Sequence, residues 1–188
     1  MVLWTAVLVG DLATQTVSVR EQAAASLVDD FDQPLGWPNL DVARAEVHRV
    51  VEEGFGRAAL EGETLLGWIG GLPEYDGRVW ELHPLVVRRQ YRRRGIGRAL
   101  VSAFEAEAAR RGALTFTLGT DDMTGMTSLS GVDLYANIPQ HLAELHDLGR
   151  GHPFLFYRRL GFVVTGVMPD ANGHGKPDIF LSKPAARR

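Results

Sequence analysis

The sequence contains no cysteine. Disulfide scaffolds, thiol nucleophiles and cysteine-ligated zinc or iron–sulfur sites are therefore excluded. A chain without cysteine is compatible with a reducing compartment, and we expect a cytoplasmic protein. The six histidines form no i, i+4 pair and no HExxH motif. We therefore expect no metal site.

Long apolar runs are also missing. The opening residues Met1–Val9 are apolar, but no basic residue precedes them and Asp11 follows closely, so they predict a strand rather than a signal peptide. No later run approaches the roughly 20 apolar residues of a membrane-spanning helix. The 188 residues, 45% of them hydrophobic, are sufficient for one core. We expect a single domain over residues 1–188 and no membrane partner.

Net charge is small, with 20 basic and 23 acidic residues giving −3. Its distribution is uneven, because six of the basic residues lie between Arg88 and Arg98, where no acid occurs. The remainder of the chain is therefore strongly acidic. Nucleic-acid-binding proteins typically have a high pI, whereas the pI here is about 6.1. We expect two oppositely charged small ligands and no nucleic acid.

Hydrophobic periodicity predicts alternating strands and helices. Strands are expected at about 3–9, 56–60, 65–70, 78–87, 114–118, 162–168 and 178–182. Helices are expected at about 14–29, 41–53, 95–111, 139–148 and 153–160. Asp41 is the expected N-cap of the second helix. This order indicates an α/β (α+β) fold with helices on both faces of a sheet.

The most distinctive local pattern is the segment Gln90–Gly97, with the sequence QYRRRGIG, between a predicted strand and a predicted helix. Such a turn directs backbone N–H groups and the positive end of a helix dipole at one point, which favours phosphate binding. The pattern is neither a Walker loop nor a dinucleotide fingerprint. A solvated basic turn that only caps the helix is the structural alternative.

Arg92-x-x-Gly95-x-Gly97 resembles the acetyl-CoA pyrophosphate loop of the GCN5-related N-acetyltransferases (GNAT). Five further blocks resemble, in order and spacing, the aminoglycoside 6'-N-acetyltransferases of the enterococcal chromosomal type. These blocks lie at 80–87, 118–122, 127–135, 152–157 and 172–179. The resemblance implies a mixed, mostly antiparallel twisted sheet of about six or seven strands with helices on both faces. The N-terminal part matches only loosely, through Trp37-Pro38.

The donor implied by the resemblance is acetyl-CoA, with no metal. Pro84 cannot donate a ladder hydrogen bond, so it belongs at a strand edge or bulge. The family places the pantetheine arm in the resulting gap. The cofactor-binding residues implied are Leu85, Val86, Val87, Arg92, Arg93, Arg94, Gly95, Ile96, Gly97, Arg98, Thr120 and Tyr157.

Chemistry is expected beside Pro84. Glu81 and His83 are two apart on a strand and project from the same face. The acceptor amine must lose a proton, and Glu81 is the first candidate base, directly or through water; His83 is the second, since an imidazole titrates closer to neutral pH. The Leu85 N–H is the expected oxyanion donor. The resemblance places Tyr157 beside the CoA sulfur as proton donor. An ordinary half-buried strand with a proline kink is the alternative.

The acceptor implied by the resemblance is a polycationic aminoglycoside, acetylated at its 6'-amine by direct attack in a ternary complex. Carboxylates and aromatic rings suit such a ligand. The expected substrate-binding residues are Trp37, Tyr75, Glu81, His83, Asp121, Asp122 and Asp178. Two alternatives remain: acetylation of another amine (a polyamine, small metabolite or protein amine), and a non-catalytic acetyl-CoA-binding module. The resemblance also implies a homodimer.

Overall fold

The computed structural model describes residues 8–31 and 36–185. They form two compact units. The first comprises the described residues up to 116 together with Ala185, and the second comprises residues 117–184. The elements in chain order are β1 (Leu8–Asp11), α1 (Val17–Asp29), α2 (Leu40–Glu53), β2 (Phe55–Glu61), β3 (Thr64–Glu74), η1 (Tyr75–Gly77), β4 (Val79–Val87), η2 (Arg89–Tyr91), α3 (Ile96–Arg110), β5 (Thr115–Asp121), η3 (Leu134–Ala136), α4 (Ile138–Ala143), α5 (Phe154–Arg159), β6 (Val163–Met168) and β7 (Asp178–Pro184). The described residues thus contain seven strands, and the expected fold class is confirmed. Most of the predicted 3–9 strand lies outside the described residues.

In the first unit, β1, β2, β3 and β4 are neighbours in that order, each antiparallel to the next. The strands predicted at 56–60 and 65–70 are confirmed as β2 and β3, which form an antiparallel hairpin with Gly62 at φ +60° in its turn. This backbone region is readily available to glycine. The four-stranded antiparallel sheet is the frame on which three helices pack.

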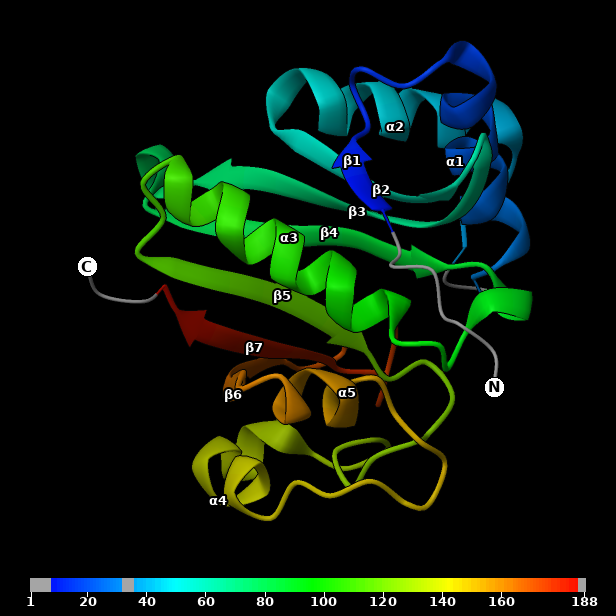
Figure 1. Cartoon of the computed structure of the whole chain (residues 1–188). Helices are drawn as coiled ribbons and strands as arrows, with labels where there is room; N and C mark the ends of the chain where they lie inside the picture. Colours follow the sequence, from blue (N-terminus) through cyan, green and yellow to red (C-terminus); the bar gives the residue numbers. More distant parts are fainter. Residues whose placement is uncertain (1–7, 32–35, 186–188) are drawn as a thin grey trace, which may run out of the picture. The chain divides into compact units, whose positions relative to one another are not determined.

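Helices cover both faces of this sheet (Figure 1). On one face, α1 and α2 bury a core with β2, β3 and β4 around Trp68. The Trp68 indole N–H lies 3.2 Å from both the Ala23 carbonyl oxygen and Ser26 Oγ, which fixes β3 against α1. On the opposite face, Phe104 of α3 packs 5.7 Å from Phe55 of β2, between ring centroids.

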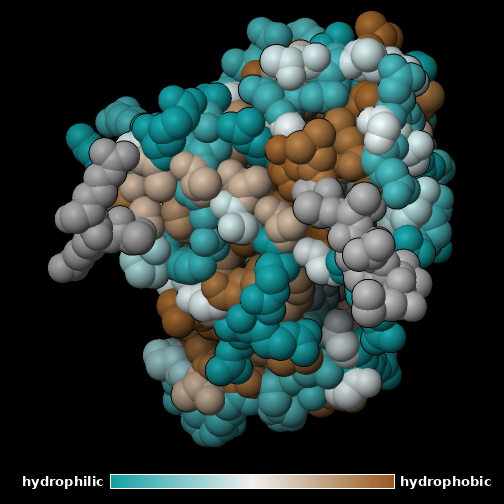
Figure 2. Space-filling model, in the orientation of Figure 1, coloured by the Kyte–Doolittle hydropathy of each residue, from teal (hydrophilic) through white to brown (hydrophobic). Residues whose placement is uncertain are grey.

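The long helix α3 is amphipathic, as its 3.6-residue period predicts. Its buried residues include Ile96, Leu100 and Phe104. The outward side carries alanines and polar groups, and Figure 2 shows it as pale brown and teal rather than deep brown. Within the described chain, no helix is long and apolar enough to cross a membrane.

In the second unit the strand order is β5, β7, β6, and β6 runs antiparallel to β7. The short helix α5 packs on both β6 and β7. Two hydrogen bonds connect the β5 region to the β7 region. The first joins the two strands, and the second joins the residue after β5 to the residue before β7. The Thr117 hydroxyl donates to the Leu181 carbonyl at 3.3 Å, and the Asp122 N–H donates to the Pro177 carbonyl at 2.9 Å. Because β7 lies between β5 and β6, β6 is the outer strand of the unit.

Two expectations about helix ends were wrong. Asn39, rather than Asp41, caps α2, because its side-chain oxygen accepts the Val42 N–H at 3.0 Å. The helix expected at 139–148 ends at Ala143. Beyond it, His146 N–H donates to the Ser128 hydroxyl at 3.1 Å, so the backbone bonds to the 126–128 loop instead of continuing the helix.

We predict that Gly70→Ala destabilises the protein. A Cβ at residue 70 would lie 2.3 Å from the His83 carbonyl oxygen. Overpacking of this kind costs about 2 kcal/mol, or about 4–8 °C in Tm for a chain of this size. The control is Gly166→Ala, whose Cβ would lie at an ordinary 3.6 Å from Phe180. Calorimetric Tm values that are equal for the two variants would contradict the prediction.

Candidate active site

The arginine-rich turn is open in the first unit. Residues 92–95 are exposed, and a Cβ built on Gly95 would meet nothing within 4 Å. Gly95 is the N-cap of α3 at φ +81° and makes no side-chain cap hydrogen bond. Its left-handed conformation brings the chain into the helix without a side chain over the first turn. The helix start is therefore accessible to an anion.

Arg92 is anchored to the protein itself. Its Nε donates to the Val87 carbonyl at 3.0 Å, and its Nη2 donates to the Asp30 carbonyl at 2.5 Å. The Asp30 carboxylate in turn accepts the Arg89 N–H at 2.7 Å. Asp30, buried at the end of α1, therefore holds the turn from two sides. Sequence reasoning missed Asp30 as a residue that positions the turn. The only signal in the sequence was its place directly after the last residue of α1.

Pro84 lies at a β-bulge, as predicted. Between β3 and β4 the pairing moves from Gly71–Leu82 to Ile69–Leu85, so His83 and Pro84 together oppose Gly70. One extra residue reverses the alternation of side chains along a strand. Side chains beyond the bulge consequently point to the face opposite to the one that simple alternation along β4 would give them.

The predicted common face of Glu81 and His83 is the face that carries α2. His83 Nε2 lies 3.4 Å from Oε1 of Glu46 on α2. Trp80 points the other way, with its ring centroid 5.1 Å from that of Phe55. Trp37 joins the first group, since its ring centroid is 5.9 Å from that of His83. The structure therefore brings together three of the predicted site residues.

Glu46 is a site residue that sequence reasoning missed. Arg49 Nε and Nη2 donate to its two carboxylate oxygens at 3.1 and 2.7 Å. Burial alone would raise the pKa of Glu46, but the hydrogen bonds from His83 and Arg49 outweigh burial and lower the pKa to about 2. The sequence could have pointed to Glu46 through its helical spacing, which places it beside Ala43, Val47 and Val50 on the buried face of α2.

Glu81 differs from Glu46 in its electrostatic environment. Burial raises the pKa of the Glu81 carboxyl above its ordinary value, and the His83 charge partly opposes that effect. A carboxylate with a raised pKa is a stronger base than an ordinary one. Tyr75, also predicted at the site, lies in η1 with 75% of its surface exposed.

In the second unit, Asp122 is fully buried and organises a loop. Its Oδ1 accepts the Met126 N–H at 2.7 Å, and its Oδ2 accepts the Thr127 N–H at 2.7 Å and hydroxyl at 2.8 Å. Burial alone would raise the pKa of Asp122, but these hydrogen bonds lower it. The loop is therefore built around an ionised carboxylate. Contact of Asp122 with substrate stays a prediction.

His152 ties β5 to the start of α5. The Phe154 N–H donates to its Nδ1 at 3.2 Å, so Nε2 carries the proton and donates to the Asp121 carbonyl at 3.1 Å. Burial lowers the pKa of His152, which keeps the ring neutral. The hydroxyl of Thr120 lies 3.4 Å from Nδ1. The Asp121 carboxylate accepts a hydrogen bond from Asn172.

Tyr157 of α5 is buried between aromatic rings. Its ring centroid is 5.1 Å from that of Phe156 and 5.8 Å from that of Phe162. Burial raises the pKa of its phenol, so the hydroxyl keeps its proton at neutral pH. Asp178, at the start of β7, packs against the β5 backbone: a Cβ on Gly119 would lie 2.6 Å from Asp178 Oδ2.

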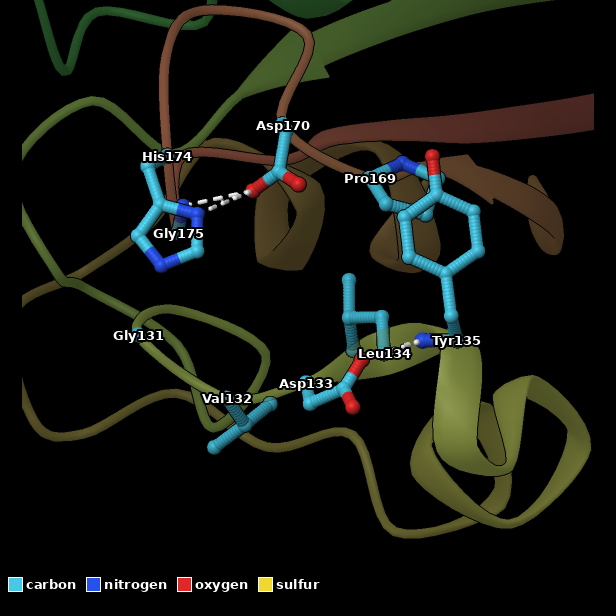
Figure 3. A pocket seen from close by; sticks show the side chains of 9 residues that line it. All are labelled: Gly131, Val132, Asp133, Leu134, Tyr135, Pro169, Asp170, His174 and Gly175. Atoms are coloured by element: carbon cyan, nitrogen blue, oxygen red, sulfur yellow. Dashed lines mark hydrogen bonds and ion pairs between the residues drawn. The ribbon is translucent and has the colours of Figure 1, made fainter.

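The second unit also contains a cavity of about 310 Å3 (Figure 3). Tyr135 and Pro169 stand on one side of it, and on the other His174 Nδ1 lies 3.7 Å from Asp170 Oδ1. None of the predicted site residues lines this cavity. Within the described residues, no group of three or more histidines and acids could hold a metal ion.

Comparison with known proteins identifies the class. Residues 20–127 match the acetyltransferase (GNAT) family, and the chain belongs to that family. It is therefore an acetyltransferase of the class that uses acetyl-CoA as donor. No curated protein sequence shows a significant match.

Three solved structures are similar over almost the whole chain. An aminoglycoside 6'-N-acetyltransferase complexed with coenzyme A is 37% identical, with a TM-score of 0.87 and coverage of 96% of this chain and 98% of that chain. The aminoglycoside 6'-N-acetyltransferase of Enterococcus faecium is also 37% identical, with a TM-score of 0.85 and the same coverage. An aminoglycoside 6'-acetyltransferase type Ii is 33% identical, with a TM-score of 0.71 and coverage of 96% and 99%.

We predict that Asp122→Asn lowers the free energy of unfolding by about 1–3 kcal/mol at neutral pH, because an amide N–H2 would face a backbone donor. The lowered pKa of Asp122 stabilises the fold above about pH 4, the unfolded pKa, and this contribution is lost as the pH falls through the folded value. The difference between the variant and the wild type should therefore shrink in acid.

Urea titrations at pH 7 and pH 3.5 measure this difference. Asp133→Asn is the control, because Asp133 is exposed and accepts the Tyr135 N–H at 3.1 Å. A loss of stability no greater for Asp122→Asn than for Asp133→Asn at pH 7 would refute the role of Asp122.

Proposed function

We propose that this chain transfers the acetyl group of acetyl-CoA to the 6'-amine of aminoglycosides by direct attack in a ternary complex. The observation that carries the proposal is the grouping of Glu81, His83 and Trp37 beside the β4 bulge. An ionisable pair next to an aromatic ring suits a sugar-linked ammonium group. The similar solved structures of aminoglycoside 6'-N-acetyltransferases support the same substrate class.

The donor is proposed to bind along the first unit from β4 to α3. The open turn at Arg92–Gly95 precedes the N-terminus of α3, and such a turn suits a pyrophosphate. Arg93, Arg94 and Arg98 are exposed and supply positive charge, whereas Arg92 braces the turn. The further cofactor-binding residues proposed are Leu85, Val86, Val87, Ile96, Gly97, Thr120 and Tyr157.

Acetyl transfer requires the acceptor to be a neutral amine. An alkyl ammonium is only about one part in a thousand neutral at pH 7, so a base must take its proton. Glu81, with its raised pKa, is the first candidate, and His83 is the second. The Leu85 N–H is proposed to stabilise the oxyanion. Tyr157, which keeps its phenolic proton at neutral pH, is the proposed proton donor to the departing thiolate of CoA, although burial makes this phenol a weaker acid than usual by raising its pKa.

Carboxylates are proposed to attract the polycationic acceptor. Glu81 is the proposed acid of the first unit, and the adjacent Glu46 is held ionised by its low pKa. Asp121 and Asp178 are the proposed acids of the second unit. Trp37 offers a ring against which a sugar or ammonium can stack.

A homodimer is proposed as the working form, through β6. This strand is the outer one of its unit, and Val163 and Met168 on it are 59% and 51% exposed. Outer strands with exposed apolar side chains tend to be covered by another chain.

We predict that the purified protein releases CoA thiol when acetyl-CoA is mixed with kanamycin or tobramycin. Glu81→Gln should lower kcat/KM by about 100-fold or more, because a base in this role contributes at least that much. The control is Glu74→Gln, an exposed acid of β3 whose charge also acts on Glu81. Turnover with another amine but with no aminoglycoside would overturn the substrate assignment, and binding of acetyl-CoA without any turnover would indicate a non-catalytic module.

We predict that Asp30→Ala weakens acetyl-CoA binding about tenfold, since hydrogen bonds that involve charged groups are worth about 1.5–3 kcal/mol. The variant releases the Arg89 N–H from its carboxylate acceptor and so loosens the turn. Titration calorimetry with acetyl-CoA measures the change. Asp29→Ala removes the exposed neighbouring acid and serves as control. Equal affinities of the two variants would show that Asp30 does not position the turn.

A further inference from the structure

Three side chains contact one another in series: Arg49 and Glu46 of α2, and His83 of β4. Arg49 grips both oxygens of the Glu46 carboxylate, and Oε1 of that carboxylate also lies 3.4 Å from His83 Nε2. The Glu46 side chain is only 14% exposed, whereas that of His83 is 39% exposed. A largely buried anion therefore faces one nitrogen of a ring that solvent and ligands can reach.

We propose that Glu46 is a positioning residue that fixes His83 as its Nε2–H tautomer, so that Nδ1 is the atom of this ring that accepts a proton from the acceptor amine. This inference rests on the proposed function, because it assigns an atom and a partner to the second of the two candidate bases. It leaves Glu81 to attract the ammonium group.

The geometry selects the tautomer. An ionised carboxylate accepts hydrogen bonds and donates none, so the nitrogen that faces Glu46 must carry hydrogen. In the neutral imidazole the other nitrogen, Nδ1, then has the free lone pair. The Trp37 ring, with its centroid 5.9 Å from that of His83 and tilted by 49°, lies against the same imidazole. Two neighbours therefore restrict the ring.

Arg49 keeps the carboxylate in place. Its two-point grip on Glu46 fixes the plane of the carboxylate, and its Nη1 also lies 3.6 Å from Oε2 of Glu53. Glu46 is thus the charged group in contact with His83, and Glu81 interacts with it electrostatically; Glu53 is paired with Arg49, and Glu74 acts on Glu81. Of the two glutamates paired with Arg49, Glu46 is the one in contact with His83.

The proton balance of the step is simple. The N–H bond of the acceptor ammonium breaks, its electron pair stays on the amine nitrogen, and the proton joins His83 Nδ1. The ring then carries hydrogen on both nitrogens and one positive charge, which the Glu46 carboxylate stabilises. Because the ring is partly exposed, the proton can pass from Nδ1 to water before the next turnover.

Nitrogen-15 NMR spectra of the wild-type protein, labelled at its histidines, test the tautomer of His83 directly. This test requires no measurement of activity. The His83 signals, assigned with His83→Asn, should show a protonated Nε2 and an unprotonated Nδ1 for the neutral ring. Glu46→Gln should give a mixture of tautomers, and Glu53→Gln should leave the wild-type pattern. A protonated Nδ1 in the neutral wild-type ring would overturn the proposal.

A double-mutant cycle tests whether Glu46 acts through His83. Glu46→Gln should lower kcat about 10- to 100-fold with a smaller change in KM. In the His83→Asn background the same change should alter kcat by no more than about twofold, because interacting residues are non-additive. Glu53→Gln, which also loses a partner of Arg49, should stay within about twofold of the wild type. An equal loss of kcat in both backgrounds would refute the proposal.

Failure of this inference and failure of the proposed function give different results. Wild-type protein that acetylates no aminoglycoside contradicts the proposed function, whatever the His83 tautomer is. An active wild type with an additive cycle contradicts only the role of Glu46. If Glu46→Gln fails to fold, Glu46→Asp replaces it in the cycle, and the wild-type spectra still decide the tautomer.

Discussion

The close approach of two backbones at Gly70 determines much of the first unit. No side chain separates Gly70 from the His83 carbonyl, and two residues of β4 share the space opposite this one glycine. The resulting bulge shifts the alternation of β4. Before the bulge, ordinary alternation turns Glu81 and His83 towards α2 and Trp80 towards the α3 side, and beyond the bulge Val86 lies in the core with α1 and α2. The ionisable pair is thus a consequence of strand geometry.

Around this bulge, the protein separates its charges by anchoring some and leaving others exposed. Arg92 is used internally, as a brace between Val87 and Asp30, and its neighbours Arg93 and Arg94 remain exposed. Glu46 is likewise held by Arg49, whereas Glu81 sits where burial raises its pKa. Glu46 thus has an adjacent charge, Arg49, that fixes its geometry, whereas Arg92 is fixed by backbone carbonyl oxygens.

The second unit uses ionised and neutral polar groups in the same way. The buried Asp122 carboxylate satisfies three donors of the 126–127 segment, and the neutral His152 ring links Asp121 to the start of α5. Buried polar groups that are fully hydrogen-bonded specify a single loop conformation. Tyr157 is held by aromatic packing and retains its proton.

Local pattern was sufficient for most of the elements and for the family, although it misplaced the start of α2 and the end of α4. The 3.6-residue period located α3, the proline at 84 indicated the bulge, and the turn from Arg92 to Gly97 identified the donor class. Partners distant in sequence were decided only by tertiary structure: Glu46 against His83, and Asp30 against the arginine turn. Periodicity and turn chemistry depend on neighbouring residues, whereas a contact between residues dozens of positions apart exists only after the strands and helices have packed.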